Sequence, residues 1–414
     1  MARHRPVSRI FILMLSVFAC TRAIAGDEFI ISYWWGPPVT EDPDRRYAEV
    51  AECNFTHASF PGGGATEEQN LAILDACQKH GLKFIVNDPR VLQFAPEHPQ
   101  FKANLDAIVA AYSGRPALAG YHVADEPGAG AFRQLGAVNR HLLQADPQRL
   151  PWINLLPNFV RESILGSTYE QHVERYLTEV KPRLLCFDHY GLMKDGSMHT
   201  MYFENFEIIR RQGLLHETPF GFIFLATPHG AFRNPTGIDL RWQVFNGLAY
   251  GARAIFYFTY WTPAPDGANT FHNGIIEQNG TRTEHYEMAK RINAEVRAWA
   301  PTLMLLASTG VYHTGVIPAG CQALTEAAGV KLVGNASLVI ATFRHADGAD
   351  WLIIVNRDFK EIASPTLEFL RPTPALQELS SADGRLLWTK MKSGGFPLQL
   401  PPGEAKLLRL GKRE

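Results

Sequence analysis

Two adjacent carboxylates, Asp125 and Glu126, follow an apolar run at residues 117–124 and precede Pro127 and Gly128. Such a run is typical of a buried parallel strand, and barrel enzymes place their chemistry at the C-terminal ends of these strands. Placing acidic side chains beside apolar surroundings costs free energy, so such residues are often kept because they bind a ligand or take part in catalysis. The pair therefore indicates acid–base chemistry by carboxyl groups. The alternative is that Asp125 caps the next helix and Glu126 pairs with a basic residue.

Apolar runs like this one recur and alternate with amphipathic segments between about residues 28 and 300. In the amphipathic segments apolar residues return every three or four positions, as in 67–80, which predicts helices. Eight strands alternating with helices over this length predict a (β/α)8 TIM barrel. We expect its strands within residues 29–35, 55–60, 82–87, 117–124, 151–156, 184–189, 220–226 and 254–261. An open doubly wound sheet is disfavoured, because the first strand ends without a glycine-rich phosphate loop.

The pattern changes after Pro301. Short runs rich in valine and leucine alternate there with glycine, aspartate, asparagine and proline, and helical periodicity is missing. This predicts a small antiparallel β-sandwich over residues 303–414, following a barrel over 26–302. No flexible linker separates the two parts, so we expect them to pack directly on each other.

The first 25 residues look like a targeting segment. Basic residues precede an apolar stretch at 10–19, and the small residues Ala23 and Ala25 mark a cleavage site. The stretch is too short for a permanent transmembrane helix. We expect a signal peptide over 1–25 and an exported protein, periplasmic or extracellular. A lipid anchor on Cys20 is the alternative.

Composition narrows the possible partners. The 414 residues carry a formal net charge of −1, which argues against nucleic acid as a ligand. Cleavage after Ala25 leaves four cysteines, and the helical setting of Cys77 and the apolar setting of Cys186 favour buried free thiols. No metal-ligand spacing is present and no cofactor is implied. Nothing in the sequence indicates an oligomeric state.

Polar or aromatic side chains stand at the C-terminal end of every predicted strand. Aromatic rings offer a flat surface to the apolar face of a sugar, while amides, imidazoles and carboxylates bind its hydroxyl groups. A carbohydrate is therefore the expected ligand, with Trp35 and Trp261 as platforms. The candidate binding residues are Trp35, Asp88, His122, Asp125, Asn154, His189, Tyr190, His229, Tyr260 and Trp261.

Glycosidic bond hydrolysis needs one protonated and one ionised carboxyl group. Glu126 is the expected general acid, because its side chain is long and burial beside Asp125 would raise its pKa. On a regular strand, His122 shares a face with Ala124 and Glu126, while Asp125 faces the other way. Both acids can serve one site only if the strand bends there.

Asp125-Glu126-Pro127 resembles the Asn-Glu-Pro that ends strand four in (β/α)8 glycoside hydrolases of clan A. The stretch 273–286 and the closing Pro401-Pro402-Gly403-Glu404 also resemble β-galactosidase-like members. The resemblance covers most of residues 28–410 in architecture and a few short motifs, without assigning a family. It implies a glycosidase in which Glu126 is the acid/base and Asp125 replaces the usual Asn.

One departure concerns the second carboxylate, which clan A places at the end of strand seven. That strand ends here in Ala226-Thr227-Pro228-His229 and carries no acid. Asp188 after strand six is the best replacement, followed by Asp88 and then Glu277. We expect Asp188 to act with Glu126 in a retaining reaction. The alternatives are a hexosaminidase in which Asp125 steadies a 2-acetamido group, and a carbohydrate-binding barrel without catalysis.

Overall fold

The computed structural model describes residues 28–411 apart from 268, 371–374, 390 and 392–394. Eight parallel strands pair in chain order, and β8 pairs with β1. Thr56 N donates to Ile31 O over 3.1 Å, which joins the first two strands and closes the barrel. The predicted TIM barrel is therefore confirmed. Its strands are β1 (Ile30–Trp34), β2 (His57–Ala58), β3 (Lys83–Asn87), β4 (Leu118–Asp125), β5 (Leu150–Leu155), β6 (Leu185–Asp188), β7 (Phe220–Leu225) and β8 (Ala254–Phe258).

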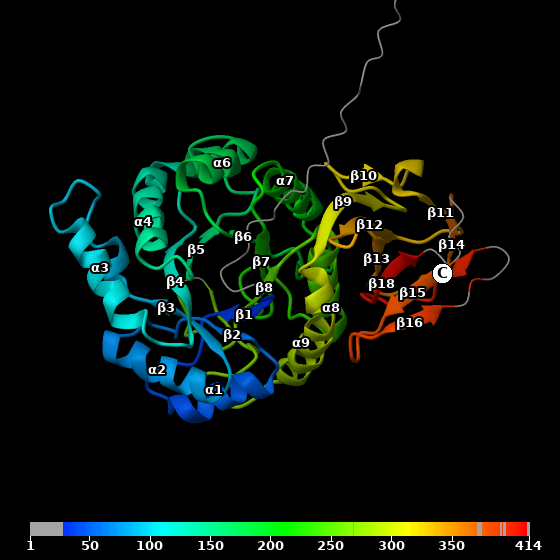
Figure 1. Cartoon of the computed structure of the whole chain (residues 1–414). Helices are drawn as coiled ribbons and strands as arrows, with labels where there is room; N and C mark the ends of the chain where they lie inside the picture. Colours follow the sequence, from blue (N-terminus) through cyan, green and yellow to red (C-terminus); the bar gives the residue numbers. More distant parts are fainter. Residues whose placement is uncertain (1–27, 268, 371–374, 390, 392–394, 412–414) are drawn as a thin grey trace, which may run out of the picture.

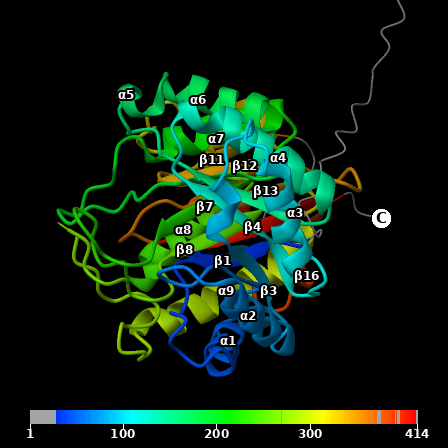
Figure 2. The same cartoon turned by 90° about the vertical axis from the view of Figure 1, so that its left-hand side faces the viewer.

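Helices surround these strands in the alternation expected from the sequence (Figures 1 and 2). Thr66 and Thr236 each begin a helix with a reciprocal capping box, which satisfies amide groups at the helix start. The helices are α1 (Pro43–Glu52), α2 (Glu67–Lys79), α3 (Phe101–Tyr112), α4 (Phe132–Ala145), α5 (Glu162–Leu165), α6 (Tyr169–Arg175), α7 (Tyr202–Leu215), α8 (Gly237–Tyr250) and α9 (Glu284–Leu303).

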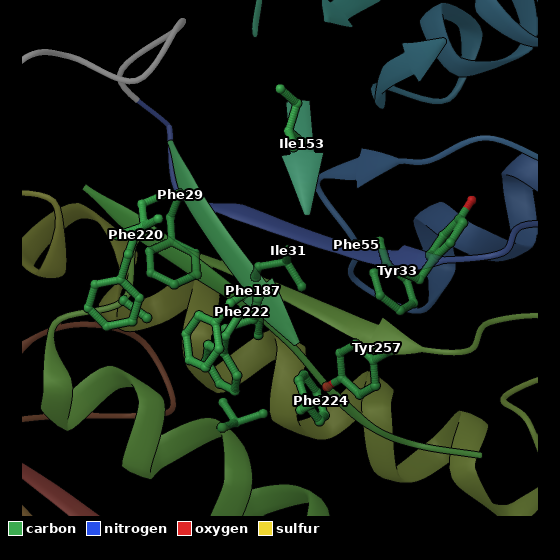
Figure 3. Close-up of a cluster of buried hydrophobic side chains, with 14 of the residues drawn as sticks. Phe29, Ile31, Tyr33, Phe55, Ile153, Phe187, Phe220, Phe222, Phe224 and Tyr257 are labelled. Carbon is green, nitrogen blue, oxygen red and sulfur yellow. The ribbon is translucent and has the colours of Figure 1, made fainter. Parts of the chain in front are cut away.

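Alternate residues of the strands enter two different cores. Side chains that point outward, such as Phe187, Phe222 and Tyr257, pack between the strands and the helices (Figure 3). Those that point inward fill the barrel, where Trp152 stacks on Phe256 with ring centroids 4.5 Å apart. The interior is thus packed with side chains, and the chemistry is left to the strand ends.

The C-terminal part consists of two sheets that enclose a core of their own, as predicted. Pairing is antiparallel except between β10 and β9. The larger sheet has the order β10-β9-β12-β13-β18-β15-β16 and the smaller β11-β14-β17. The strands are β9 (Leu306–His313), β10 (Gln322–Ala323), β11 (Val330–Val333), β12 (Leu338–His345), β13 (Asp350–Asn356), β14 (Thr366–Phe369), β15 (Ala375–Leu379), β16 (Leu386–Thr389), β17 (Phe396–Pro397) and β18 (Ala405–Gly411).

Helices α8 and α9 lie between the barrel strands and these sheets (Figure 1). Trp242 Nε1 donates to Arg357 O over 2.9 Å, and the hydroxyl of Tyr250 lies 2.8 Å from His313 Nε2. Both tyrosine and histidine are buried at this contact. The two parts therefore share a packed interface without a flexible connection.

Cys53, Cys77 and Cys186 are buried free thiols, and Cys321 is a half-buried one. Within the described part of the chain, no helix is long and apolar enough to cross a membrane. The predicted signal peptide over 1–25 and its alternative, a lipid anchor at Cys20, lie outside the described residues.

Candidate active site

A bulge in β4 turns Asp125 toward the barrel axis and places Glu126 beside it at the strand end. In the pairing of β4 with β5, His122 lies opposite Trp152, but the register then shifts and Asp125 lies opposite Asn154. Glu126 follows with a positive φ of 46°, and its amide still donates to Asn154 O over 2.8 Å. This is the bend that both acids require to serve one site. The predicted common face of His122, Ala124 and Glu126 is wrong, because the bulge reverses the alternation after His122.

Asn154 at the end of β5 joins two of the acids. Its Nδ2 donates to Asp125 Oδ1 over 3.1 Å and to Asp188 Oδ1 over 3.0 Å. Asn154 and Asp188 are buried, and Asn154 Oδ1 has no partner among the described residues. The amide thus holds carboxyl groups from two different strands, and its contact with substrate stays a prediction.

The three carboxyl groups perturb one another. Burial is the main cause that raises the pKa of Asp188 well above its ordinary value, and the charge of Glu126 and a hydrogen bond between these two carboxyl groups add to it. Asp125 is exposed by surface area, yet the protein around its carboxyl removes enough solvent to raise its pKa to about 7, assisted by the charge of Glu126. Donation from Asn154 opposes both shifts. The unliganded site therefore holds protons on carboxyl groups near neutral pH.

Glu126 is exposed, although it was expected to be buried beside Asp125. The left-handed backbone at this residue carries the side chain to the rim, while Asp188 remains beneath it. The site therefore combines a buried carboxyl group on Asp188 with an exposed one on Glu126, and the two differ in their access to solvent. That difference is what general acid–base chemistry with a pair of acids requires.

His122 lies inside the barrel among aromatic rings. Its ring is 4.5 Å from Phe60, 5.4 Å from Trp34 and 5.6 Å from Trp152 between centroids. Burial lowers the pKa of His122 to about 4, so the ring is neutral at physiological pH. His122 therefore packs below the carboxyl groups and is not at the rim.

His189 is also buried, in a polar network behind β6. Asn205 Oδ1 accepts from the amide of Asn158 over 2.9 Å and lies 3.0 Å from His189 Nδ1, while Asn205 Nδ2 donates to Tyr169 OH over 2.8 Å. Burial lowers the pKa of His189 to about 3. The structure does not place this side chain among the carboxyl groups; its ring contacts Asn205, His199 and Tyr202 instead.

Tyr190 and His229 do belong to the rim beside the carboxyl groups. The pKa of Tyr190 is raised by burial and then by the charges of Asp188, Glu126 and Asp125, so its hydroxyl lies within their field and stays protonated. Its ring centroid is 5.3 Å from that of His229. Phe258 lies 5.0 Å from both rings. Phe258 was missed in the sequence, although Phe256 and Phe258 on one strand share the inward face.

Three other predicted binding residues, Asp88, Tyr260 and Trp261, do not lie beside the carboxyl groups. Both carboxylate oxygens of Asp88 are used by Arg90 and by the hydroxyl of Tyr112 on α3. Tyr260 is fully buried and stacks on Tyr33 with centroids 4.7 Å apart. Trp261 is buried, and the Arg46 guanidinium lies 4.8 Å from its ring centroid.

Trp35 remains a half-buried aromatic side chain after β1. Its φ is 62°, and its indole lies so close to the loop after β2 that a Cβ on Gly62 would be 2.3 Å from Nε1. A glycine is therefore required at position 62 to let the ring lie there. Trp35 keeps its place as a candidate platform on the rim.

Strand β7 ends at Leu225 and carries no carboxylate, so the strand count from the sequence does not slip. Glu277, the third candidate, accepts a 2.7 Å hydrogen bond from the amide of Asn273 within the loop after β8. No group of three or more His, Cys, Asp or Glu residues in the described part of the chain could hold a metal ion.

Comparison with solved structures gives barrels with related architecture. A glycoside hydrolase family 5 protein from Bacteroides vulgatus ATCC 8482 is 10% identical, with a TM-score of 0.60 over 92% of this chain and 89% of that one. A β-galactosidase from Bacillus circulans sp. alkalophilus is 8% identical, with a TM-score of 0.57 over 93% and 99%. The predicted resemblance of the fold to clan A glycoside hydrolases is confirmed, without a family assignment.

A β-galactosidase from Marinomonas ef1 is 12% identical at a TM-score of 0.49, and the match covers 65% of this chain and 60% of that protein. No protein-family model matches the chain, and no curated protein matches it in sequence.

Proposed function

We propose that this protein is a glycoside hydrolase that cleaves O-glycosidic bonds of an oligo- or polysaccharide with Glu126 and Asp188 as its carboxyl pair. The observation that carries the proposal is the pair of interacting carboxyl groups, buried Asp188 and exposed Glu126, at the C-terminal end of the barrel. Active sites of this fold lie at that end. The glycoside hydrolases with which the chain shares its fold add support.

We further propose a retaining course. Retaining glycosidases hold the two carboxyl groups about 5–5.5 Å apart, whereas inverting enzymes leave room for a water molecule between acid and base. The direct interaction of the Asp188 and Glu126 carboxyl groups favours the closer arrangement of retaining enzymes. Asp188 would attack the anomeric carbon as Glu126 protonates the leaving oxygen, and water would then release the sugar from Asp188 with Glu126 as base.

This assignment requires one proton to move. Burial and the charge of Glu126 raise the pKa of Asp188, so this residue holds its proton in the unliganded protein. A bound sugar would have to break the contact between the two acids, after which the proton passes to Glu126. Asn154 would then stabilise the ionised Asp188 through its hydrogen bond.

The test is hydrolysis of a panel of chromogenic glycosides by wild type, Glu126→Gln and Asp188→Asn, followed by azide rescue of Asp188→Gly. A glycosyl azide of opposite anomeric form marks Asp188 as the nucleophile. An azide of the same form makes Asp188 the acid and exchanges the two roles. Near wild-type hydrolysis by Asp188→Asn would rule out the pair.

A second candidate follows from the bulge, which also turns Asp125 toward the site beside Glu126. In that case Asp125 would steady a 2-acetamido group that attacks the anomeric carbon, with Glu126 as the acid. Activity restricted to 2-acetamido glycosides, abolished in Asp125→Asn and kept in Asp188→Asn, would favour this hexosaminidase mechanism.

A further inference from the structure

His229 is held in one tautomer by the backbone. Its Nδ1 lies 2.9 Å from the carbonyl oxygen of Thr227, which can only accept, so Nδ1 carries the proton. Burial, together with the charge of Lys194, lowers the pKa of His229, and the carbonyl contact only partly offsets this. The ring is therefore neutral at physiological pH, and Nε2 presents a lone pair.

That lone pair is available to a ligand. The ring of His229 is half-buried, and no described residue hydrogen-bonds its Nε2. By contrast, Nε2 of His122 and of His189 are enclosed and have no partner among the residues that the structure describes. The ammonium group of Lys194 donates a 2.6 Å hydrogen bond to the carbonyl oxygen of Gly230 and not to the imidazole of His229.

Four aromatic side chains lie around the ring of His229, and we name these five residues together the His229 recess. Their ring centroids lie between 5.0 and 5.4 Å from that of His229, and all four are half-buried. They come from the ends of β6 and β8 and from the loops after β7 and β8. The residues are Tyr190, Phe232, Phe258 and Phe271.

The recess is braced and lies beside the carboxyl pair. Lys194 N donates to Ala231 O, and Arg233 N to Leu192 O, both over 3.0 Å, so the loops after β6 and β7 are tied together. Tyr190 belongs to the recess and also feels the charges of Asp188 and Glu126. A sugar ring at the carboxyl groups would therefore have the recess as a wall.

We propose that the His229 recess is a sugar subsite in which His229 Nε2 accepts a hydrogen bond from one hydroxyl of a carbohydrate whose apolar face packs on the surrounding rings. This inference rests on the proposed function, and it names the recognition chemistry of the same site. A neutral imidazole with its other nitrogen already bound is an acceptor only. It selects a hydroxyl donor at one position of the sugar.

The experiment is a thermodynamic cycle that combines removal of the His229 side chain with removal of one substrate hydroxyl at a time. The best aryl glycoside from the panel is compared with its monodeoxy analogues for wild type and His229→Ala. At one position, removal of the hydroxyl should lower kcat/KM of wild type about tenfold or more, because the acceptor is then left unpaired. The same removal should lower kcat/KM of His229→Ala less than about twofold, since the partner is already gone.

Two further variants separate hydrogen bonding from packing. His229→Gln, which carries an acceptor oxygen, should restore part of the penalty for the missing hydroxyl, whereas His229→Lys, which only donates, should not. The matched control is His199→Ala, a half-buried histidine on the neighbouring loop outside the recess. It should keep the full wild-type penalty.

The subsite would be overturned if removal of each hydroxyl lowers kcat/KM equally in wild type and in the His229 variants, and if these variants keep the wild-type melting temperature. That result would leave the proposed hydrolysis intact. If wild type cleaves no glycoside, the proposed function fails instead. The same cycle is then measured by calorimetric binding of methyl glycosides and their monodeoxy analogues. Coupling to His229 in those affinities would support the subsite in a binding protein, and its absence would overturn it.

Discussion

Asn154 on β5 holds Asp188 on β6 through a 3.0 Å hydrogen bond from Nδ2 to Oδ1, and its second proton goes to Asp125 on β4. One side-chain amide thus spans three neighbouring strands of the barrel. It opposes the rise in pKa that burial and mutual charge impose on both aspartates. Asn154 is therefore a positioning residue that also sets the proton affinity of the site.

Replacing Asn154 by Ala should lower kcat/KM about 10- to 100-fold, the usual effect of losing a hydrogen bond to a charged group. Because the amide lowers the pKa of Asp188, its loss should move the acidic limb of the pH profile to higher pH. The control is Asn158→Ala, whose side chain donates to Met201 O and not to a carboxyl group. A pH profile that is unchanged in Asn154→Ala would show that the amide is merely structural.

Glu126→Gln should lower kcat more than about 100-fold on glycosides with poor leaving groups, because the leaving oxygen would no longer be protonated. Activated aryl glycosides need little protonation and should lose much less. Steady-state kinetics over a series of leaving groups measures the difference. Equal losses across the series, or none, would exclude Glu126 as the acid.

Stability should fall as the pH rises through neutrality. A carboxyl group whose pKa is raised by folding holds its proton more tightly in the native state, so its contribution is complete below its unfolded pKa and lost as pH rises through the folded pKa. For Asp125 that window runs from its ordinary value up to about 7. Asp125→Asn and Asp188→Asn should therefore melt at a higher temperature than wild type at pH 8, with a smaller difference at pH 5.

The control for this measurement is Asp195→Asn. Asp195 is a rim carboxylate whose pKa is lowered by hydrogen bonds from Ser197, so it titrates below the window tested. Calorimetric melting curves at the two pH values compare the four proteins. The raised pKa values would be contradicted if wild type melts no lower at pH 8 than at pH 5 and the two aspartate variants show the same pH dependence of melting temperature.

Expression of residues 26–302 alone should give an aggregating or strongly destabilised protein. Removal of the sandwich would uncover the surface of α8, where Trp242 and Tyr250 contact Arg357 and His313. Large exposed apolar patches of this kind promote association. Light scattering and thermal melting of the truncated protein decide the matter, and a soluble, fully active barrel would refute the prediction.

The barrel and the sandwich could be predicted because they follow from local patterns. Apolar runs such as 220–226 and 254–261 alternate with helical periodicity, and the change after Pro301 marks the sheets. The gathering of Asp125, Asn154 and Asp188 also follows from chain order, since adjacent parallel strands end at the same rim. Tyr260 and Trp261 were misplaced, because the sequence does not show where β8 stops alternating; it ends at Phe258.

By itself, the sequence determined the order of the elements, the carboxylates at the ends of strands four and six, and the missing acid on strand seven. Only the tertiary structure decided which side each residue faces. The bulge between His122 and Ala124 arises from the pairing of β4 with β5, and it turns Asp125 inward. Burial likewise depends on neighbours distant in sequence, so the enclosure of Asp188 and His189, and the exposure of Glu126, could not be read from the chain alone.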